Sequence, residues 1–183
     1  GTITVKSSDD GLNAKDWTLE SSEAQRPGQQ TKTVKAEAAN AKNLDQAGDV
    51  KIVIDGGTLT VDAEGDGLDA NGSIEINGGT VVVNGPTSGA NAALDYDNNA
   101  KLNGGTVLFV DNGEMTMGFG SDSSQAFLMA SVQGAAGATV EVVDSSGKTV
   151  ASLKASKSFS TVLISSPEIK EGEKYTIKVG SNS

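Results

Sequence analysis

The residues best suited to chemistry in this sequence are aspartates and asparagines in a short phrase that recurs. The phrase is Asp10-Gly-Leu-Asn-Ala14, then Asp66-Gly-Leu-Asp-Ala70, then Ala92-Ala-Leu-Asp-Tyr96. If successive copies stack, their polar side chains gather in columns, and the candidate metal ligands are Asp9, Asp10, Asn13, Asp66, Asp69, Asn91, Asp95 and Asp97. Hard oxygen ligands without His or Cys favour Ca²⁺.

Stacking would place carboxylates at the spacing of neighbouring strands, about 4.8 Å. At that distance they repel one another unless a cation lies between or beside them, and the three phrases contain no lysine. The alternative is a solvated turn face, because Asp and Asn also suit the backbone of turns. For a single aspartate both explanations stay open, whereas for the whole column we expect calcium.

Composition excludes several other kinds of site. The 183 residues include no Cys and no His, which excludes disulfides, thiolate zinc sites, Cys nucleophiles and the commonest general base. The net charge of −10 argues against direct nucleic-acid binding. No apolar run approaches the roughly 18 residues of a membrane span, and no signal peptide is recognisable at the start. We expect either a mature form or a piece of a longer protein.

A second phrase indicates which elements must hold these side chains. Ile52-Val-Ile-Asp-Gly-Gly-Thr58 returns as Ile74-Glu-Ile-Asn-Gly-Gly-Thr80 and as Ala100-Lys-Leu-Asn-Gly-Gly-Thr106, and the first glycines are 22 and 26 residues apart. Both phrases keep their order, and apolar residues alternate around the glycines. Such a unit suits three short strands and three turns, which predicts a parallel β-helix. The motifs of leucine-rich repeats and of tandem calcium nonapeptide rolls are absent.

Stacked coils place equivalent residues in columns. The expected inward columns are Ile54–Ile76–Leu102, Leu59–Val81–Val107 and Leu12–Leu68–Leu94, and the expected polar corner columns are Asp55–Asn77–Asn103 and Thr58–Thr80–Thr106. Each coil buries its apolar face only against its neighbours, so the stack is stable collectively.

The chain divides into two predicted parts. Residues 1–112 form the coils, with a polar insertion at about 16–49 that we expect to be an exposed loop. Residues 113–183 contain strand-like segments and the hairpin signal Asp144-Ser-Ser-Gly147. We expect a four- or five-stranded antiparallel appendage that caps the β-helix, because an open coil is an unpaired edge. An independent binding role of this appendage is the alternative.

Catalysis is one functional hypothesis. Acidic pairs such as Asp9 with Asp10, or Asp95 with Asp97, could supply the general acid and base of a glycosidase. Pectin-cleaving hydrolases share the β-helix, but they resemble one another in motifs with His and an R-x-K cluster, which are absent here. Pectate lyases need Arg or Lys beside a calcium-bound uronate, and the only arginine is Arg26 in the insertion. We therefore expect that the protein is not an enzyme.

Aromatic side chains can stack on sugar rings, but they are scarce in this chain. Trp17 opens the insertion, and Tyr96 lies between two candidate calcium ligands. Both are candidate carbohydrate-binding residues, and Tyr96 is the better one. A lone Trp in the position of Trp17 more often packs a loop onto the β-helix, and that explanation stands beside the first.

Several phrases together resemble a known family. They are Ser7-Ser-Asp-Asp-Gly-Leu-Asn13, Gly65-Asp-Gly-Leu-Asp-Ala-Asn-Gly72, Asn84-Gly-Pro-Thr-Ser-Gly89, Ala93-Leu-Asp-Tyr-Asp97, and Ser156-Lys-Ser-Phe159 followed by Ser165-Ser-Pro167. In this order, and over nearly the whole chain, they resemble the bacterial calcium-dependent carbohydrate-binding domain family of pectate-lyase-like β-helices, described from clostridial cell-surface proteins that bind acidic plant polysaccharides.

The resemblance implies an all-β protein: a right-handed, pectate-lyase-like parallel β-helix with the antiparallel cap. It also implies non-catalytic, calcium-dependent binding of polygalacturonate-like glycans by a secreted or cell-surface bacterial protein. The family usually has more coils upstream, so the chain is similar to its C-terminal part. The insertion at 16–49 is longer than the link expected there.

The rival hypothesis is a structural or adhesive surface protein in which calcium serves only stability. In that case the N-terminal coil would stack on another chain, so self-association through this open coil is a further expectation. Glycan binding with and without a chelator distinguishes the two hypotheses.

Overall fold

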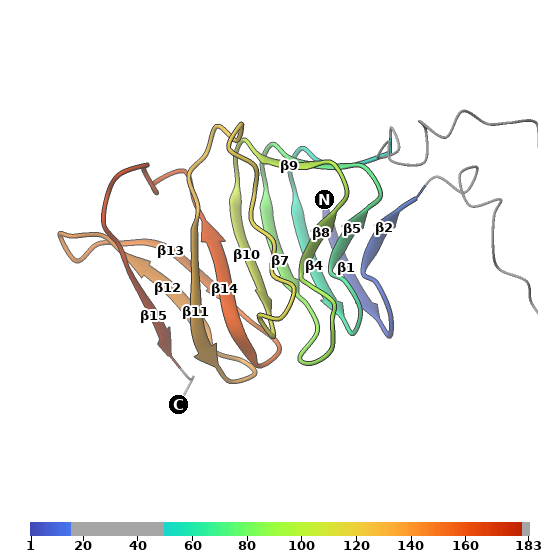
Figure 1. Ribbon diagram of the computed structural model, residues 1–183. Coiled ribbons are helices and arrows are strands. Elements are labelled where there is room, and N and C mark those ends of the chain that lie inside the picture. The colour runs from blue at the N-terminus through green and yellow to red at the C-terminus, as the bar shows by residue number, and fades with distance from the viewer. Residues whose placement is uncertain (16–49, 181–183) are drawn as a thin grey trace, which may run out of the picture.

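The computed structural model describes residues 1–15 and 50–180, so the predicted insertion at 16–49 lies outside the described residues. Every regular element of the described part is a β-strand (Figure 1), which confirms the predicted all-β class. None of the described residues belongs to a helix long and apolar enough to cross a membrane.

The strands before residue 112 form successive coils of three strands, and these coils stack side by side (Figure 1). The first coil consists of β1 (Thr2–Ser7), β2 (Leu12–Ala14) and β3 (Lys51–Ile54), the second of β4 (Thr58–Ala63), β5 (Leu68–Ala70) and β6 (Ser73–Ile76), the third of β7 (Thr80–Asn84), β8 (Leu94–Tyr96) and β9 (Asn99–Leu102), and β10 (Thr106–Asp111) starts a fourth. Corresponding strands pair in parallel, which gives the sheets β2-β5-β8 and β3-β6-β9 and the run β1-β4-β7-β10. This is a β-helix-like arrangement, as the repeat predicts; its right-handed, pectate-lyase-like form stays a prediction.

Strand register confirms the three predicted apolar columns, Leu12–Leu68–Leu94, Ile54–Ile76–Leu102 and Leu59–Val81–Val107. The middle residues Leu68, Ile76 and Val81 are fully buried. Leu12 and Ile54 are only half-buried, because the first coil has a neighbour on one side alone among the described residues. Burial in the stack therefore depends on the coil above and the coil below.

Backbone conformation explains the Gly-Gly-Thr corner. The second glycine of each copy has a φ of 85° at Gly57, 91° at Gly79 and 95° at Gly105, the left-handed region that favours glycine. The predicted polar column lies at the same corner: the side-chain amide of Asn77 donates to Asp55 Oδ1 at 2.8 Å, and that of Asn103 donates to Asn77 Oδ1 at 2.9 Å. The predicted threonine column lies in register as well.

The strands after residue 112 divide between two sheets, which differs from the single antiparallel appendage that the sequence predicts. β14 (Phe159–Ser165) and β11 (Leu128–Gly134) extend the run of parallel strands into a six-stranded sheet of order β1-β4-β7-β10-β14-β11. β12 (Thr139–Val143), β13 (Thr149–Lys154) and β15 (Thr176–Gly180) form a separate antiparallel sheet of order β13-β12-β15. The proposed boundary between residues 112 and 113 follows β10, but the main sheet continues across it.

The C-terminal strands divide between two sheets because β10 and β14 carry apolar side chains on both faces. Phe109 and Leu163 belong to the core inside the coils. Leu108 and Val162 face the opposite way, into a second core that includes Val140 of the separate sheet. Near-continuous apolar runs are typical of strands that are covered on both sides. At the end of the stack β10 pairs with β14, and the separate sheet covers the outer face of the main sheet; the capping role of these strands stays a prediction.

Candidate metal and glycan site

The outward face of the sheet β2-β5-β8 holds the acidic column. Asn13, Asp69 and Asp95 are the central residues of these three strands and lie directly in register. Successive side chains of a strand point to opposite faces. The leucine before each central residue is packed in or against the core, so the central side chain faces outward.

The turns before these strands hold the second set of carboxylates. Asp10 Oδ1 accepts a hydrogen bond from the backbone N–H of Asp66 at 3.0 Å, and Asp66 Oδ1 accepts one from the N–H of Ala92 at 2.6 Å. Each aspartate therefore ties its own turn to the equivalent turn of the next coil. A glycine is needed beside them, because a Cβ at Gly65 would lie 2.6 Å from Asp10 Oδ1.

Three carboxylates converge where the turn meets the strand. Asp10, Asp66 and Asp69 each place an oxygen within 4.8 Å of the others. The side-chain amide of Asn13 donates to Asp10 at 2.9 Å and to Asp69 at 2.5 Å, which holds the two carboxylates on either side of it. The donor set is made entirely of hard oxygens, which fits Ca²⁺ better than a transition metal.

The electrostatic cost of this convergence appears in the pKa values. Burial, and then the charges of the neighbouring aspartates with Asp10 first, raise the pKa of Asp69 from 3.8 to about 6. Burial also raises the pKa of Asp66, with Asp95, Asp10 and Asp9 adding to the effect and the hydrogen bond from Ala92 opposing it. A bound cation would favour the charged forms and relieve this repulsion.

The other predicted ligands lie around this group without belonging to it. Asp95 continues the column one coil further. Asp97 accepts a hydrogen bond from the side-chain amide of Asn71 at 3.1 Å. Asp9 is exposed in the first turn, and Asn91 is half-buried just before Ala92. Their roles as calcium ligands stay predictions.

Of the two aromatic residues predicted to contact sugar, only Tyr96 lies among the described residues. Tyr96 is in register with Ala70 and packs against the core, and its hydroxyl donates to the carbonyl of Gly118 at 2.7 Å. The structure thus shows a packing role for Tyr96, and its contact with sugar stays a prediction. Trp17 lies outside the described residues.

Asp111 is a buried residue that the repeated phrases do not point to, and it orders the turn before β8. Asp111 is buried at the end of β10, and its carboxylate accepts hydrogen bonds from the N–H of Ala93, the N–H of Gly113 and the hydroxyl of Thr116. It thereby holds the turn that leads into β8, the strand of Asp95. The available signal was an aspartate that directly follows the apolar run Val107–Val110.

Fold and site together define a class: an all-β, β-helix-like protein with an acidic turn face that could hold a hard cation. The chain also matches a family model, described as carbohydrate-binding domain-containing protein, over residues 25–181. It belongs to that family, whose name describes binding rather than catalysis. The match includes Asp66, Asp69 and Asp95 but begins after Asp10 and Asn13. No curated protein and no solved structure matches the chain.

Proposed function

We propose that the protein binds acidic polysaccharide of the polygalacturonate kind through calcium held on the turn face, without catalysing a reaction. The observation that supports this most is the convergence of Asp10, Asp66 and Asp69 from two adjacent coils. Their oxygens are donors that Ca²⁺ prefers. Asp95 is the next donor along the column and would face the same ligand.

The net charge of the protein supports a bridging cation. A chain of charge −10 repels a polyanion at long range, so binding of a polyuronate needs a local reversal of sign. A bound divalent cation is often the largest local charge of a site and supplies that reversal. Exposed calcium modules outside cells bind weakly, and we propose a secreted or cell-surface location on a bacterium.

Titration calorimetry with calcium tests the first part of the proposal, and retention on immobilised polygalacturonate with calcium or with EDTA tests the second. We expect calcium binding below about 1 mM, the range of weak extracellular sites, and retention that is lost in EDTA. If calcium does not bind in that range, the acidic column is only a solvated turn face.

A structural role for calcium is the second candidate, and one observation favours it. Asp10 and Asp66 already connect successive coils through the backbone N–H groups of Asp66 and Ala92. A cation there would stabilise the stack even if no glycan ever bound. In this case calcium raises the melting temperature while retention on polygalacturonate stays at the background level with and without EDTA.

A further inference from the structure

A cleft lies between the segment before β11 and the loop before β15, and its lining residues are not those of the acidic column. The volume of this cleft is about 520 Å³, within the range of roughly 300–1,000 Å³ found for ligand pockets. Its lining combines apolar and polar side chains, among them Phe127, Leu128, Ile169, Ser121, Glu171 and Glu173. None of these residues belongs to the site described above.

The apolar side of the cleft is supported from behind. Phe127 is half-buried, and its ring meets Phe119 edge-on with the ring centres 5.7 Å apart. Phe119 in turn meets Phe109 of β10 edge-on at 5.7 Å. A ring fixed in this way offers an apolar surface whose ordering costs little further entropy on binding.

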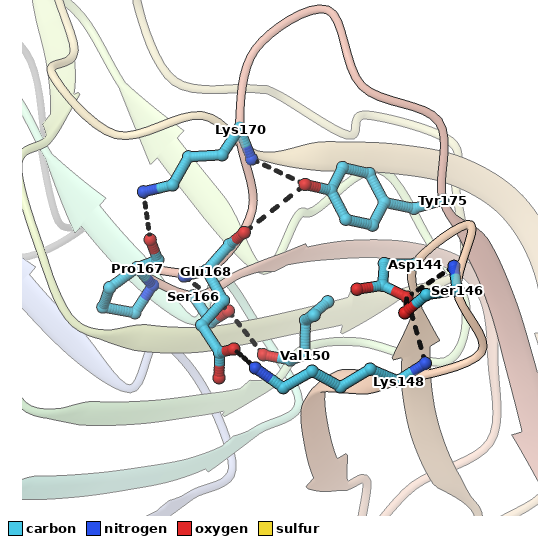
Figure 2. A network of polar contacts seen from close by, with 9 residues as sticks. All are labelled: Asp144, Ser146, Lys148, Val150, Ser166, Pro167, Glu168, Lys170 and Tyr175. Atoms are coloured by element: carbon cyan, nitrogen blue, oxygen red, sulfur yellow. Dashed lines mark hydrogen bonds and ion pairs between the residues drawn. The ribbon is translucent and has the colours of Figure 1, made fainter.

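The loop on the other side of the cleft is pinned at both ends (Figure 2). Ser166 donates from its hydroxyl to the carbonyl of Val150 at 2.6 Å. The hydroxyl of Tyr175 accepts from the backbone N–H of Lys170 at 2.9 Å, and the Lys170 ammonium donates to the carbonyl of Pro167 at 2.7 Å. The wall of the cleft is therefore preformed.

Glu168 adds an ion pair with Lys148 to the same loop (Figure 2). Glu171 and Glu173 follow in the same loop, line the cleft and are exposed. Their side chains and that of Ser121 have no hydrogen-bond or ion-pair partner among the described residues. These two carboxylates and this hydroxyl are exposed to solvent, so a ligand in the cleft can reach them.

An amphipathic ligand fits this lining. A sugar unit has an apolar C–H face, which suits Phe127, and hydroxyl groups, which donate strong hydrogen bonds to carboxylates. Lys170 is the one cation of the lining, against Glu171 and Glu173, so an anionic sugar meets net repulsion.

We infer that this cleft is a second carbohydrate-binding site, which takes an uncharged sugar unit and needs no calcium. The inference rests on carbohydrate binding as the proposed function, but not on the metal. One face of the molecule would then bind acidic glycan through calcium, and the junction with the C-terminal strands would bind neutral glycan directly.

The test is a titration of the whole chain, in EDTA, with three neutral hexasaccharides: fragments of β-1,4-glucan, β-1,4-mannan and β-1,4-xylan. We expect at least one to bind at concentrations up to about 10 mM. Asp66→Asn with Asp69→Asn should leave this binding unchanged. If none of the three binds, the inference is overturned, while calcium-dependent retention of polygalacturonate is unaffected by that result.

Variants of the cleft locate the binding. Phe127→Leu keeps apolar volume but removes the ring, and Glu171→Gln with Glu173→Gln removes both carboxylates; each should weaken binding at least about tenfold. Glu114→Gln with Glu141→Gln, which removes two carboxylates outside the lining, is the matched control and should change nothing. Because the double glutamate change lies in an exposed loop, it tests the cleft even if Phe127→Leu lowers stability. If the variant Glu171→Gln with Glu173→Gln binds the hexasaccharide as tightly as its control does, the sugar binds outside this cleft.

Discussion

At the scale of single residues, Asp69 shows how the fold raises the energy of a charge. Its carboxylate lies within 4.8 Å of those of Asp10 and Asp66, and Asn13 is the neutral donor between two of them. Burial and the charges of the neighbouring aspartates raise the pKa of Asp69, and two predictions depend on this electrostatic repulsion.

The first prediction concerns the double change Asp66→Asn with Asp69→Asn. It should weaken calcium binding at least about tenfold and slightly raise the stability of the calcium-free protein, because like-charge repulsion is relieved. The amide oxygen introduced by Asp66→Asn can still accept from the N–H of Ala92, so the link between coils is preserved. Calorimetry with calcium, and urea unfolding in EDTA, measure the two effects.

Asp55→Asn is the matched control, because Asp55 is an exposed aspartate at a different corner of the coil, between β3 and β4. It removes one charge without touching the turn face and should leave calcium affinity unchanged. Equal calcium affinity of the wild type and the double variant would exclude this cluster as the metal site.

The second prediction is a pH dependence of the calcium-free protein. The pKa of Asp69 is about 6 in the folded state against 3.8 ordinarily, so between these values the folded state binds more protons than the unfolded state. The free energy of unfolding should therefore fall as the pH rises from about 4 to 6. Because Asp69 is partly exposed, solvent screening limits this contribution to roughly 1 kcal/mol.

Urea unfolding in EDTA across this range measures the effect, with Asp69→Asn as the comparison. The fall should be smaller in the variant, and saturating calcium should remove it from the wild type. Parallel pH profiles for the two proteins in EDTA would contradict the assignment of the shifted pKa to Asp69.

At the scale of elements, the short strands β2, β5 and β8 combine two tasks. Their leucines form an inward column, and their central residues form the acidic column on the other face. A strand of three residues has little stability alone, so its position depends on packing with adjacent coils. A substitution that opens a cavity in the inward leucine column should therefore also shift the carboxylates on the other face of these strands.

The third prediction is that Leu68→Ala lowers the free energy of unfolding by about 2–5 kcal/mol, the usual cost of a cavity at a fully buried leucine. Leu12→Ala is the matched change at the half-buried end of the same column and should cost less. Urea unfolding of both variants measures the difference. A neutral Leu68→Ala would mean that this column is not the core that the structure describes.

At the scale of the whole molecule, the two ends of the stack differ. Beyond β10 the main sheet continues into β14 and β11, and a second core covers its outer face. At the other end, no described strand pairs with the outer edges of β1, β2 and β3, and Ile3 is 61% exposed. Self-association through this first coil stays a prediction, for which exposed apolar side chains and unpaired backbone groups are the physical reason.

The fourth prediction concerns removal of residues 113–183. The remaining chain would lose the antiparallel pairing of β10 with β14 and expose Leu108 and Val110, which are buried in the second core. We expect aggregation, because an unpaired apolar edge strand is a template for other chains. Size-exclusion chromatography and thermal melts measure it. A monomeric fragment 1–112 with the melting temperature of the full chain would show that the C-terminal strands are not a cap.

Much of the coil geometry could be predicted from the sequence, because it depends on local repetition. Two phrases that recur in constant order align Leu12, Leu68 and Leu94 and place Asn13 over Asp69 and Asp95. A shift by one residue would turn every buried side chain outward, so the alternation of apolar residues determines the register. The composition, in turn, limits the donor set to oxygens.

The tertiary structure alone decided which of these residues meet. The sequence does not show that Asp10, Asp66 and Asp69 converge while Asp97 pairs with Asn71, because that depends on how each turn folds back on the next coil. It also does not show that β14 joins the main sheet whereas β12 joins another. Antiparallel strands of similar pattern can pair in several orders. The apolar run Val107–Val110 indicates that both faces of β10 are covered, but the strands that cover them are chosen by long-range packing.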